Sequence, residues 1–276
     1  MVFAVHQADE CISSTIASTG AWEHFQTAME AFLLSEGGTR KGTFVDVGAN
    51  IGWHSMAMAL WLGGAGQVYA FEPHPHNFAL LQANAQINGF SNVELVKMAC
   101  SNFAGSAKLY MGNDANMGTH SLYQEAGRDR PINVQVLTLD DYFKDVVLSD
   151  GPVVVKIDTE GSEPSVIQGG MRFIEAYKKR FSLFMELNFS QHSHNIDDVM
   201  GMLKVFREIG IEPFAISTSR STLHLISYQY LFDSIEESMQ DHGKFYADFL
   251  FCGYEGAKAL RSYTHPLVNE ISFRNI

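Results

Sequence analysis

Short runs of apolar, β-branched residues alternate with longer amphipathic stretches along most of the chain. Short, mostly apolar runs of four to six residues are typical of buried parallel strands, and they predict strands at 44–47, 68–71, 93–98, 153–157 and 183–187. The stretches between them carry apolar residues three and four positions apart and end at glycine, which predicts helices. This alternation predicts an α/β fold with a mostly parallel sheet and helices on both faces.

Two parts of the chain depart from the alternation. Residues 108–111 and 134–139 look like extra strands on either side of a polar loop, 112–131, which is a candidate lid. Residues 213–216 and 223–226 are strand-like but only six residues apart, too few for a parallel crossover, so we expect an antiparallel edge hairpin. Residues 249–252 are expected to form another edge strand.

Composition narrows the classes of protein to consider. The 276 residues are 46% hydrophobic and 18% charged, as in a folded domain, and the formal net charge of −12 disfavours nucleic acid as a partner. Three cysteines without CxxC spacing indicate neither a disulfide framework nor a thiolate zinc site and fit a cytoplasmic location. The beginning has no basic leader, and glycines interrupt the most apolar stretch, 55–71, so we expect no signal peptide and no membrane span.

The turn after the first strand carries the first candidate chemistry. It runs from Asp46 through Gly48 and Asn50 to Gly52, and its glycines allow a ligand to approach the backbone. The spacing is GxxxG rather than the GxGxxG of dinucleotide sites, and Asp46 would repel a pyrophosphate. The same carboxylate suits a ligand with an ammonium or sulfonium charge, as S-adenosylmethionine has.

The second strand ends in an acidic residue at the place where adenosine ligands are bound. Glu72 lies twenty residues beyond Gly52 and is followed by Pro73. A carboxylate at this place accepts hydrogen bonds from both ribose hydroxyls, in NAD sites and adenosyl sites alike. Together with Asp46 and Asn50 it favours S-adenosylmethionine.

Five stretches carry a family resemblance, in order and in spacing. The chain resembles the FkbM-type S-adenosylmethionine-dependent methyltransferases from about residue 12 to 190, in FVDVGANIGWHS, VYAFEPHPHNFALLQANAQING, VLTLDDYF, VVVKIDTEGSEPSVIQGG and FMELN. The resemblance implies a Rossmann-like class I fold with a seven-stranded sheet, and methyl transfer to a hydroxyl of a sugar or natural product. It also implies that a set of residues binds the cofactor, namely Asp46, Gly48, Asn50, Gly52, Glu72, Pro73, Ala99, Cys100 and Ser101.

Polar residues at the ends of two later strands are candidates for catalysis. The strand 153–157 is followed by Asp158, our first candidate for a general base or an acceptor-positioning group, and by Glu160, the second. Glu186 ends the next strand. For Glu163, before a proline at a helix start, stabilisation by free backbone N–H groups is the better explanation.

The same strand ends leave a metal site open as an alternative. The oxygens of Asp158, Glu186 and Asn188 resemble the ligand set with which some O-methyltransferases bind Mg²⁺. The histidine pairs at 74/76 and 192/194 lie in loops without a nearby cysteine, so they indicate zinc only weakly.

Several residues are candidates for contact with the methyl acceptor. They comprise one residue past the glycine turn, two in the polar loop and two at or after the fifth strand: His54, His120, Ser121, Asn188 and His192. Loops more often than cores set specificity, although an ordinary turn explains 120–121 almost as well.

The sequence therefore predicts a single methyltransferase domain over 1–276, with an N-terminal helical cap (1–40), a cofactor-binding core (41–228) and a C-terminal extension (229–276). Its expected acceptor is a small hydroxylated glycan or natural product, with neither nucleic acid nor membrane as a partner. Two alternatives remain open: an NAD-linked oxidoreductase and a cofactor-binding protein without activity. The sequence indicates no oligomeric state.

Ligand stabilisation separates the two cofactor classes. A ligand that binds only the folded state raises the melting temperature, so S-adenosylhomocysteine should stabilise the protein and NAD should not. Thermal unfolding with each compound in excess measures this. Stabilisation by NAD alone would favour the oxidoreductase.

Overall fold

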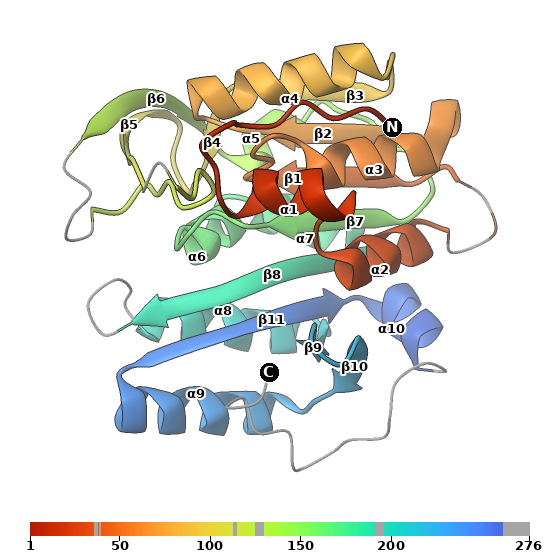
Figure 1. Ribbon diagram of the computed structural model, residues 1–276. Coiled ribbons are helices and arrows are strands. Elements are labelled where there is room, and N and C mark those ends of the chain that lie inside the picture. Colours follow the sequence, from red (N-terminus) through yellow and green to blue (C-terminus); the bar gives the residue numbers. More distant parts are fainter. Residues whose placement is uncertain (36–37, 39, 113–114, 125–129, 191–195, 262–276) are drawn as a thin grey trace.

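The computed structural model describes residues 1–35, 38, 40–112, 115–124, 130–190 and 196–261. A central eight-stranded sheet runs in the order β10-β9-β11-β8-β7-β1-β2-β3, with helices on both faces (Figure 1). The α/β class and the mostly parallel sheet are confirmed. The sheet has one strand more than the family resemblance led us to expect.

The parallel half of the sheet positions the predicted site. Its strands are β1 (Thr43–Val47), β2 (Gln67–Phe71), β3 (Val93–Val96), β7 (Val153–Ile157) and β8 (Phe181–Ser190). In the register, Val47 of β1 lies opposite Phe71 of β2 and Ile157 of β7. The residues that follow these three strands therefore emerge side by side at one edge of the sheet.

The other half of the sheet is antiparallel. β9 (Glu212–Ser217) and β10 (Thr222–Leu225) form the predicted edge hairpin. β11 (Lys244–Cys252), however, pairs with both β8 and β9, so the expectation of an edge strand at 249–252 is wrong. Its alternating pattern buries Phe245, Phe249 and Phe251 in the core, and a central position gives this apolar strand a partner on each side.

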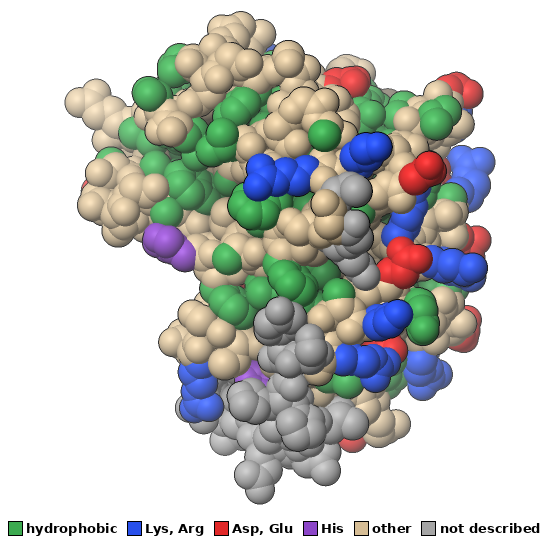
Figure 2. Space-filling model, turned by 90° about the vertical axis from the view of Figure 1, so that its right-hand side faces the viewer, with side chains coloured by type: hydrophobic (Ala, Val, Ile, Leu, Met, Phe, Trp, Pro, Cys, Tyr) green, Lys and Arg blue, Asp and Glu red, His purple; other side chains and the backbone are tan. Residues whose placement is uncertain are grey.

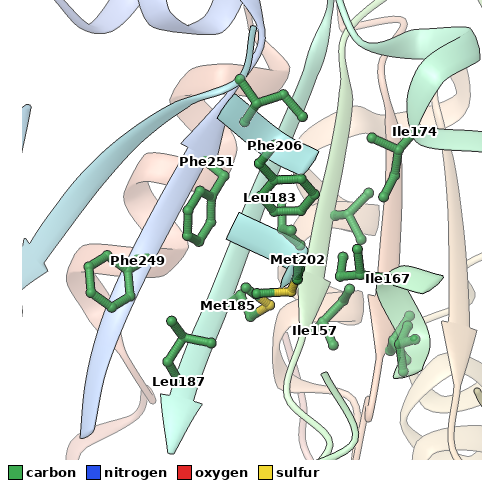
Figure 3. Packing of buried hydrophobic residues seen from close by; sticks show 14 of the residues in the cluster. Ile157, Ile167, Ile174, Leu183, Met185, Leu187, Met202, Phe206, Phe249 and Phe251 are labelled. Carbon is green, nitrogen blue, oxygen red and sulfur yellow. The ribbon is translucent and has the colours of Figure 1, made fainter. Parts of the chain in front are cut away.

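Two hydrophobic cores cover the two faces of the sheet. On one face pack α5 (Leu139–Phe143), α6 (Glu163–Gln168), α7 (Met171–Tyr177), α8 (Ile196–Glu208) and α9 (Tyr228–His242). Figure 3 shows Met202 and Phe206 of α8 against Leu183 and Met185 of β8. The opposite face carries α2 (His24–Leu34), α3 (Trp53–Leu62), the 3-10 helix η2 (Gly63–Ala65), α4 (Pro75–Ile87) and α10 (Tyr254–Leu260).

A small second sheet stands beside the carboxyl edge of the main one. It consists of β4 (Ala99–Cys100), β6 (Pro131–Leu137) and β5 (Gly105–Tyr110), in that order. The two extra strands predicted around 108–111 and 134–139 are therefore present, each beginning about three residues earlier than expected. Part of the loop between them, residues 113–114 and 125–129, lies outside the described residues.

The N-terminal segment is fastened along α4 before it enters α1 (Ile12–Thr19). Asn84 accepts a hydrogen bond from the backbone N–H of Ala4 (2.6 Å) and donates to the carbonyl oxygens of Ala4 (3.0 Å) and Ile51 (2.9 Å). Asn88 forms the same reciprocal pair with Val2, at 2.8 and 2.6 Å. Two asparagine amides thus bind the extended segment as a neighbouring strand would.

The surface and the helices show two further features. Lys and Arg side chains lie among Asp and Glu side chains on the face seen in Figure 2. None of the helices in the described part of the chain is both long and apolar enough to cross a membrane.

Replacing Asn84 tests the fastening of the N-terminal segment. Asn84→Ala leaves the backbone groups of Ala4 and Ile51 without their partner, and the loss should lower the free energy of unfolding by about 1–3 kcal/mol. Denaturant titration measures it. Gln86→Ala, at an exposed position of the same helix, is the control and should change stability by less than about 0.5 kcal/mol. Equal effects would show that the asparagine contacts contribute nothing.

Candidate functional site

The turn after β1 is shaped by three residues with positive φ. Gly48 has φ of 84°, Asn50 of 51° and Gly52 of 90°, a region that favours glycine and tolerates asparagine. A Cβ on Gly48 would lie 1.9 Å from the carbonyl oxygen of Asp158, and one on Gly52 would lie 2.4 Å from Leu81. Both glycines are therefore required by the close approach of other chain segments.

Glu72 connects the ends of the first two strands. Its Oε2 accepts a hydrogen bond from the backbone N–H of Asn50 (2.8 Å), and its Oε1 accepts one from that of His74 (2.7 Å). Burial, aided by the charges of Asp46 and Asp158 and opposed by these two hydrogen bonds, raises the pKa of Glu72 to about 7. Each oxygen keeps a second lone pair, so the carboxylate can still accept two ribose hydroxyls.

Asp46 presents a buried oxygen that lacks a partner. Its Oδ2 accepts a hydrogen bond from the Ser55 hydroxyl at 2.5 Å, whereas Oδ1 has no hydrogen-bond partner among the residues that the structure describes. The side chain is only 1% exposed, and an unsatisfied buried carboxylate oxygen is costly. An ammonium group at this place would satisfy it, as the methionine part of S-adenosylmethionine supplies.

A cavity of about 400 Å³ joins these features. Of the residues expected to bind the cofactor, those that line it are Asp46, Gly48, Asn50, Glu72, Pro73, Ala99 and Cys100. Ser101 is not among the residues that line it and lines a separate hollow next to α6, so its contact with the cofactor stays a prediction. Gly52 is not among the lining residues, but its positive φ is part of the turn that forms the wall. Residues of α1 and of the loop after β5 cover the cavity, among them Ile12 and Gly118.

The far end of the cavity is strongly acidic. Lys156 donates a hydrogen bond to Oδ2 of Asp158 at 2.7 Å, and both side chains line the cavity. Burial alone would lower the pKa of Lys156, but the charges of Asp158, Glu23 and Asp46 outweigh it and raise that pKa. Lys156 is therefore a fixed cation that holds Asp158 in place.

Glu186 and Asp248 face each other across β8 and β11 at this end. Burial, with the charges of Asp158 and Asp248, raises the pKa of Glu186 to about 9, and Oε2 of Glu186 accepts a hydrogen bond from the Tyr246 hydroxyl at 3.1 Å. Burial, with the charges of Glu23 and Asp158, raises the pKa of Asp248 to about 7. Neither Tyr246 nor Asp248 was among the predicted site residues. The polar side chains at 246 and 248, alternating with apolar ones along β11, were the signal for both.

The loop after β7 contains Glu160 and Glu163 and contacts Ser121, and these three residues differ in their surroundings. Glu160 lines the cavity and has φ of 52°, while its carbonyl oxygen accepts a hydrogen bond from the Ser121 hydroxyl at 2.7 Å. Ser121 also accepts the N–H of Tyr123 and is not among the residues that line the cavity, so these contacts favour the ordinary turn over contact with an acceptor. Oε1 of Glu163 accepts the N–H groups of Thr159 (2.9 Å) and Gly161 (3.1 Å), so Glu163 has a structural role, with donors from the loop before α6.

His54 is held between two carboxylates. Its Nδ1 lies 2.8 Å from Glu30 and its Nε2 lies 3.0 Å from Glu23. Burial would lower its pKa, but the charge of Glu30 and the hydrogen bonds from both carboxylates raise it to about 10. The imidazolium ties α2 to α3 beside the cavity, and both of its nitrogens have carboxylate partners. His54 also lines the cavity, and its contact with an acceptor stays a prediction.

The other histidines considered in the sequence analysis have different positions. His120 lines the cavity, its Nδ1 accepts the N–H of Gly112 (2.9 Å), and its ring lies 4.2 Å from that of His74. His74 is buried as the N-terminal cap of α4, and burial lowers its pKa to about 4. Asn188 lines the acidic end of the cavity. His192 lies outside the described residues.

The predicted metal site is not supported. In the described part of the chain, no group of three or more His, Cys, Asp and Glu side chains is arranged to hold a metal ion. The ammonium group of Lys156 occupies one oxygen of Asp158, and the Tyr246 hydroxyl occupies one oxygen of Glu186.

Comparison with known proteins gives the family. The protein-family model described as "Methyltransferase FkbM domain" matches residues 46–246 of this chain. Hexuronic acid methyltransferase AglP of Haloferax volcanii is 28% identical over 141 residues, which cover 50% of this chain and 53% of that protein. The chain thus spans about half the length of this curated relative.

Similar solved structures are distant. A putative rRNA methylase from Clostridium thermocellum covers 83% of this chain and 96% of its own at 10% identity, with a TM-score of 0.46. A SAM-dependent methyltransferase from Aquifex aeolicus covers 82% and 87% at 11% identity, with a TM-score of 0.41. Likenesses of this degree carry no functional inference.

The raised pKa of Glu72 makes cofactor binding depend on pH. Ribose hydroxyls donate to the ionised carboxylate, whereas the free protein holds a proton on Glu72 below pH 7. Affinity for S-adenosylhomocysteine should therefore rise by up to about tenfold per pH unit below about pH 7 and level off above it. Calorimetry from about pH 5.5 to about pH 8.5 measures the profile.

Two variants identify the titrating group in this profile. Glu72→Gln should bind more weakly and lose the rise with pH. Asp248→Asn should keep the rise, although Asp248 titrates in the same range. A wild-type profile without slope, or the same slope in Glu72→Gln, would contradict the assignment.

Proposed function

Because the chain belongs to the FkbM methyltransferase family, we propose that it transfers the methyl group of S-adenosylmethionine to a hydroxyl oxygen of a sugar or a related small molecule. Its activity as a methyltransferase dependent on S-adenosylmethionine follows from the family, which also removes the NAD-linked alternative. The oxygen acceptor and the roles of single residues are the proposal. The observation that carries it is the carboxylate of Asp158, held by Lys156 at the wall of the cavity.

The residues at the amino-acid and ribose ends of the cavity fit the cofactor. Asp46 would receive its ammonium group, Glu72 its ribose hydroxyls, and Cys100 would line the adenine side. When bound, S-adenosylmethionine supplies a methyl group already activated by the sulfonium. The protein's contribution is then to align a nucleophile with that carbon and to remove its proton.

Asp158 is the best candidate to accept that proton. Its contact with Lys156 leaves Oδ1 for an acceptor hydroxyl, and its side chain is 37% exposed toward the cavity. Burial and the charge of Asp158 raise the pKa of Glu186, and its Oε2 already accepts the Tyr246 hydroxyl, so Glu186 is better suited to hold a substrate group. Glu160 also lines the cavity and remains the second candidate.

A sugar is the acceptor class that the comparisons favour. The curated relative is named for methylation of a hexuronic acid, which bears several hydroxyl groups. The acidic end of this cavity adds hydrogen-bond acceptors on three neighbouring strands, as a polyhydroxylated ligand requires. We expect this protein to act in the cytoplasm.

Labelling with an isotopic methyl donor tests the proposal. Purified protein, incubated with an extract of its source cells, should label a small hydroxylated product whose new methyl group is bonded to oxygen. Asp158→Asn should lower kcat by about 10²- to 10⁴-fold and leave affinity for S-adenosylhomocysteine unchanged, since a general base acts on chemistry rather than on the cofactor.

Asp150→Asn, at an exposed position, is the matched control and should retain full activity. Cofactor binding without any labelled product would support the non-catalytic alternative. A product methylated on nitrogen or carbon would contradict oxygen transfer.

A further inference from the structure

Two neighbouring carboxyl groups at the acidic end form no ion pair with the described residues: Glu186 lines the cavity, and Asp248 lies beside it without being one of the lining residues. Glu186 on β8 and Asp248 on β11 are directly opposite in the antiparallel register. Like charges in this position destabilise a sheet. The register of β7 and β8 also places Asp158 beside Glu186, because Ile157 pairs with Met185. Three acidic side chains therefore meet on three adjacent strands.

The cations near this end are already committed. The charge of His54 is taken by Glu23 and Glu30, and Lys156 forms its ion pair with Asp158. Neither Glu186 nor Asp248 forms an ion pair with any residue that the structure describes. Asp248 is half-buried in the middle of β11, between the buried residues Ala247 and Phe249.

The cavity also presents buried polar atoms that a ligand would satisfy. Asp46 and Ser162 line the cavity and are each only 1% exposed. Oδ1 of Asp46 and the hydroxyl of Ser162 have no hydrogen-bond partner among the described residues. These atoms point to a polar ligand along the cavity. Burial, with the charge of Asp158 among the causes for both groups, raises the pKa values of Glu186 and Asp248, as expected for carboxyl groups close to other carboxylates.

We propose that the methyl acceptor carries an ammonium group near the hydroxyl that is methylated, as an amino sugar does, that Glu186 binds this ammonium, and that Asp248, opposite Glu186 on β11, adds negative charge behind it. The inference rests on the proposed oxygen methylation and names its substrate class. It assigns Glu186 to acceptor binding and gives Asp248 a role. It also separates this chain from the relative named for a hexuronic acid, since the carboxylate of such a sugar would be repelled here.

The same pair of carboxylates directs the methyl group to oxygen. An amine held as an ammonium has its lone pair in an N–H bond and cannot attack. The hydroxyl oxygen forms the new bond to the methyl carbon as the sulfur–methyl bond breaks. The hydroxyl proton passes to Asp158, and the sulfonium becomes the neutral thioether of S-adenosylhomocysteine. Charge and atoms balance without another reactant.

Binding to the protein saturated with S-adenosylhomocysteine tests the inference without turnover. Glucosamine, galactosamine and mannosamine are compared by calorimetry with their parent hexoses, their N-acetyl forms and the corresponding uronic acids. At least one amino sugar should bind about 10- to 100-fold more tightly than its parent and its N-acetyl form, as expected for a partly buried charge pair. The uronic acids should bind most weakly.

The double variant Glu186→Gln/Asp248→Asn should lose this preference and bind the amino sugar and its parent hexose with about the same affinity. Its affinity for S-adenosylhomocysteine reports that it is folded. The inference is overturned if no amino sugar binds more tightly than its parent, if a uronic acid binds best, or if the preference survives in the double variant.

Turnover with labelled methyl donor then separates the two proposals. An O-methylated amino sugar supports both. Tight binding of an amino sugar that is methylated on nitrogen, or not at all, would contradict the proposed function while leaving the ammonium site in place. Methylation of the neutral hexoses alone would leave oxygen transfer intact and overturn the ammonium site.

Discussion

The approach of the Gly48 backbone to the carbonyl group of Asp158 is the contact on which the site depends. A side chain at position 48 would lie 1.9 Å from that oxygen, so only glycine lets the turn after β1 close against the end of β7. The N–H of Asp158 also donates to the carbonyl oxygen of Val47 (3.0 Å). This contact brings the cofactor end and the acceptor end of the cavity together on neighbouring parallel strands.

Electrostatics then divides the cavity into two halves. Asp46 and Glu72 form the half that fits a cationic adenosyl ligand, and the raised pKa of Glu72 reflects how little water reaches it. At the other half the carboxylates outnumber the cations, since Lys156 serves Asp158 and His54 is enclosed by Glu23 and Glu30. A negatively charged cavity suits a sulfonium donor, and its uncompensated end suits an acceptor of positive charge.

Local sequence predicted the parts of the site that local structure determines. The glycine turn, Glu72 and Asp158 each follow a short buried strand, and parallel pairing brings such strand ends to one edge of the sheet. The hairpin of β9 and β10 followed equally from the length of its connection. These features require only periodicity, turn chemistry and the geometry of parallel strands.

The remaining features depend on contacts between distant segments. The position of β11 between β8 and β9 depends on pairing between segments far apart in the chain. That pairing places Asp248 and Tyr246 next to Glu186 and Asn188 of β8. His54 finds its carboxylates on and before α2, more than twenty residues away, and Ser121 turns from the cavity to the carbonyl group of Glu160. Spacing along the chain contains no signal for such pairs.

A crystal structure of the complex with S-adenosylhomocysteine tests the central assignment most directly. The assignment predicts both ribose hydroxyls within hydrogen-bond distance of Glu72, and the amino group of the ligand at Oδ1 of Asp46. A ligand whose ribose lies away from Glu72, or whose amino group leaves Oδ1 of Asp46 without a partner, would contradict it.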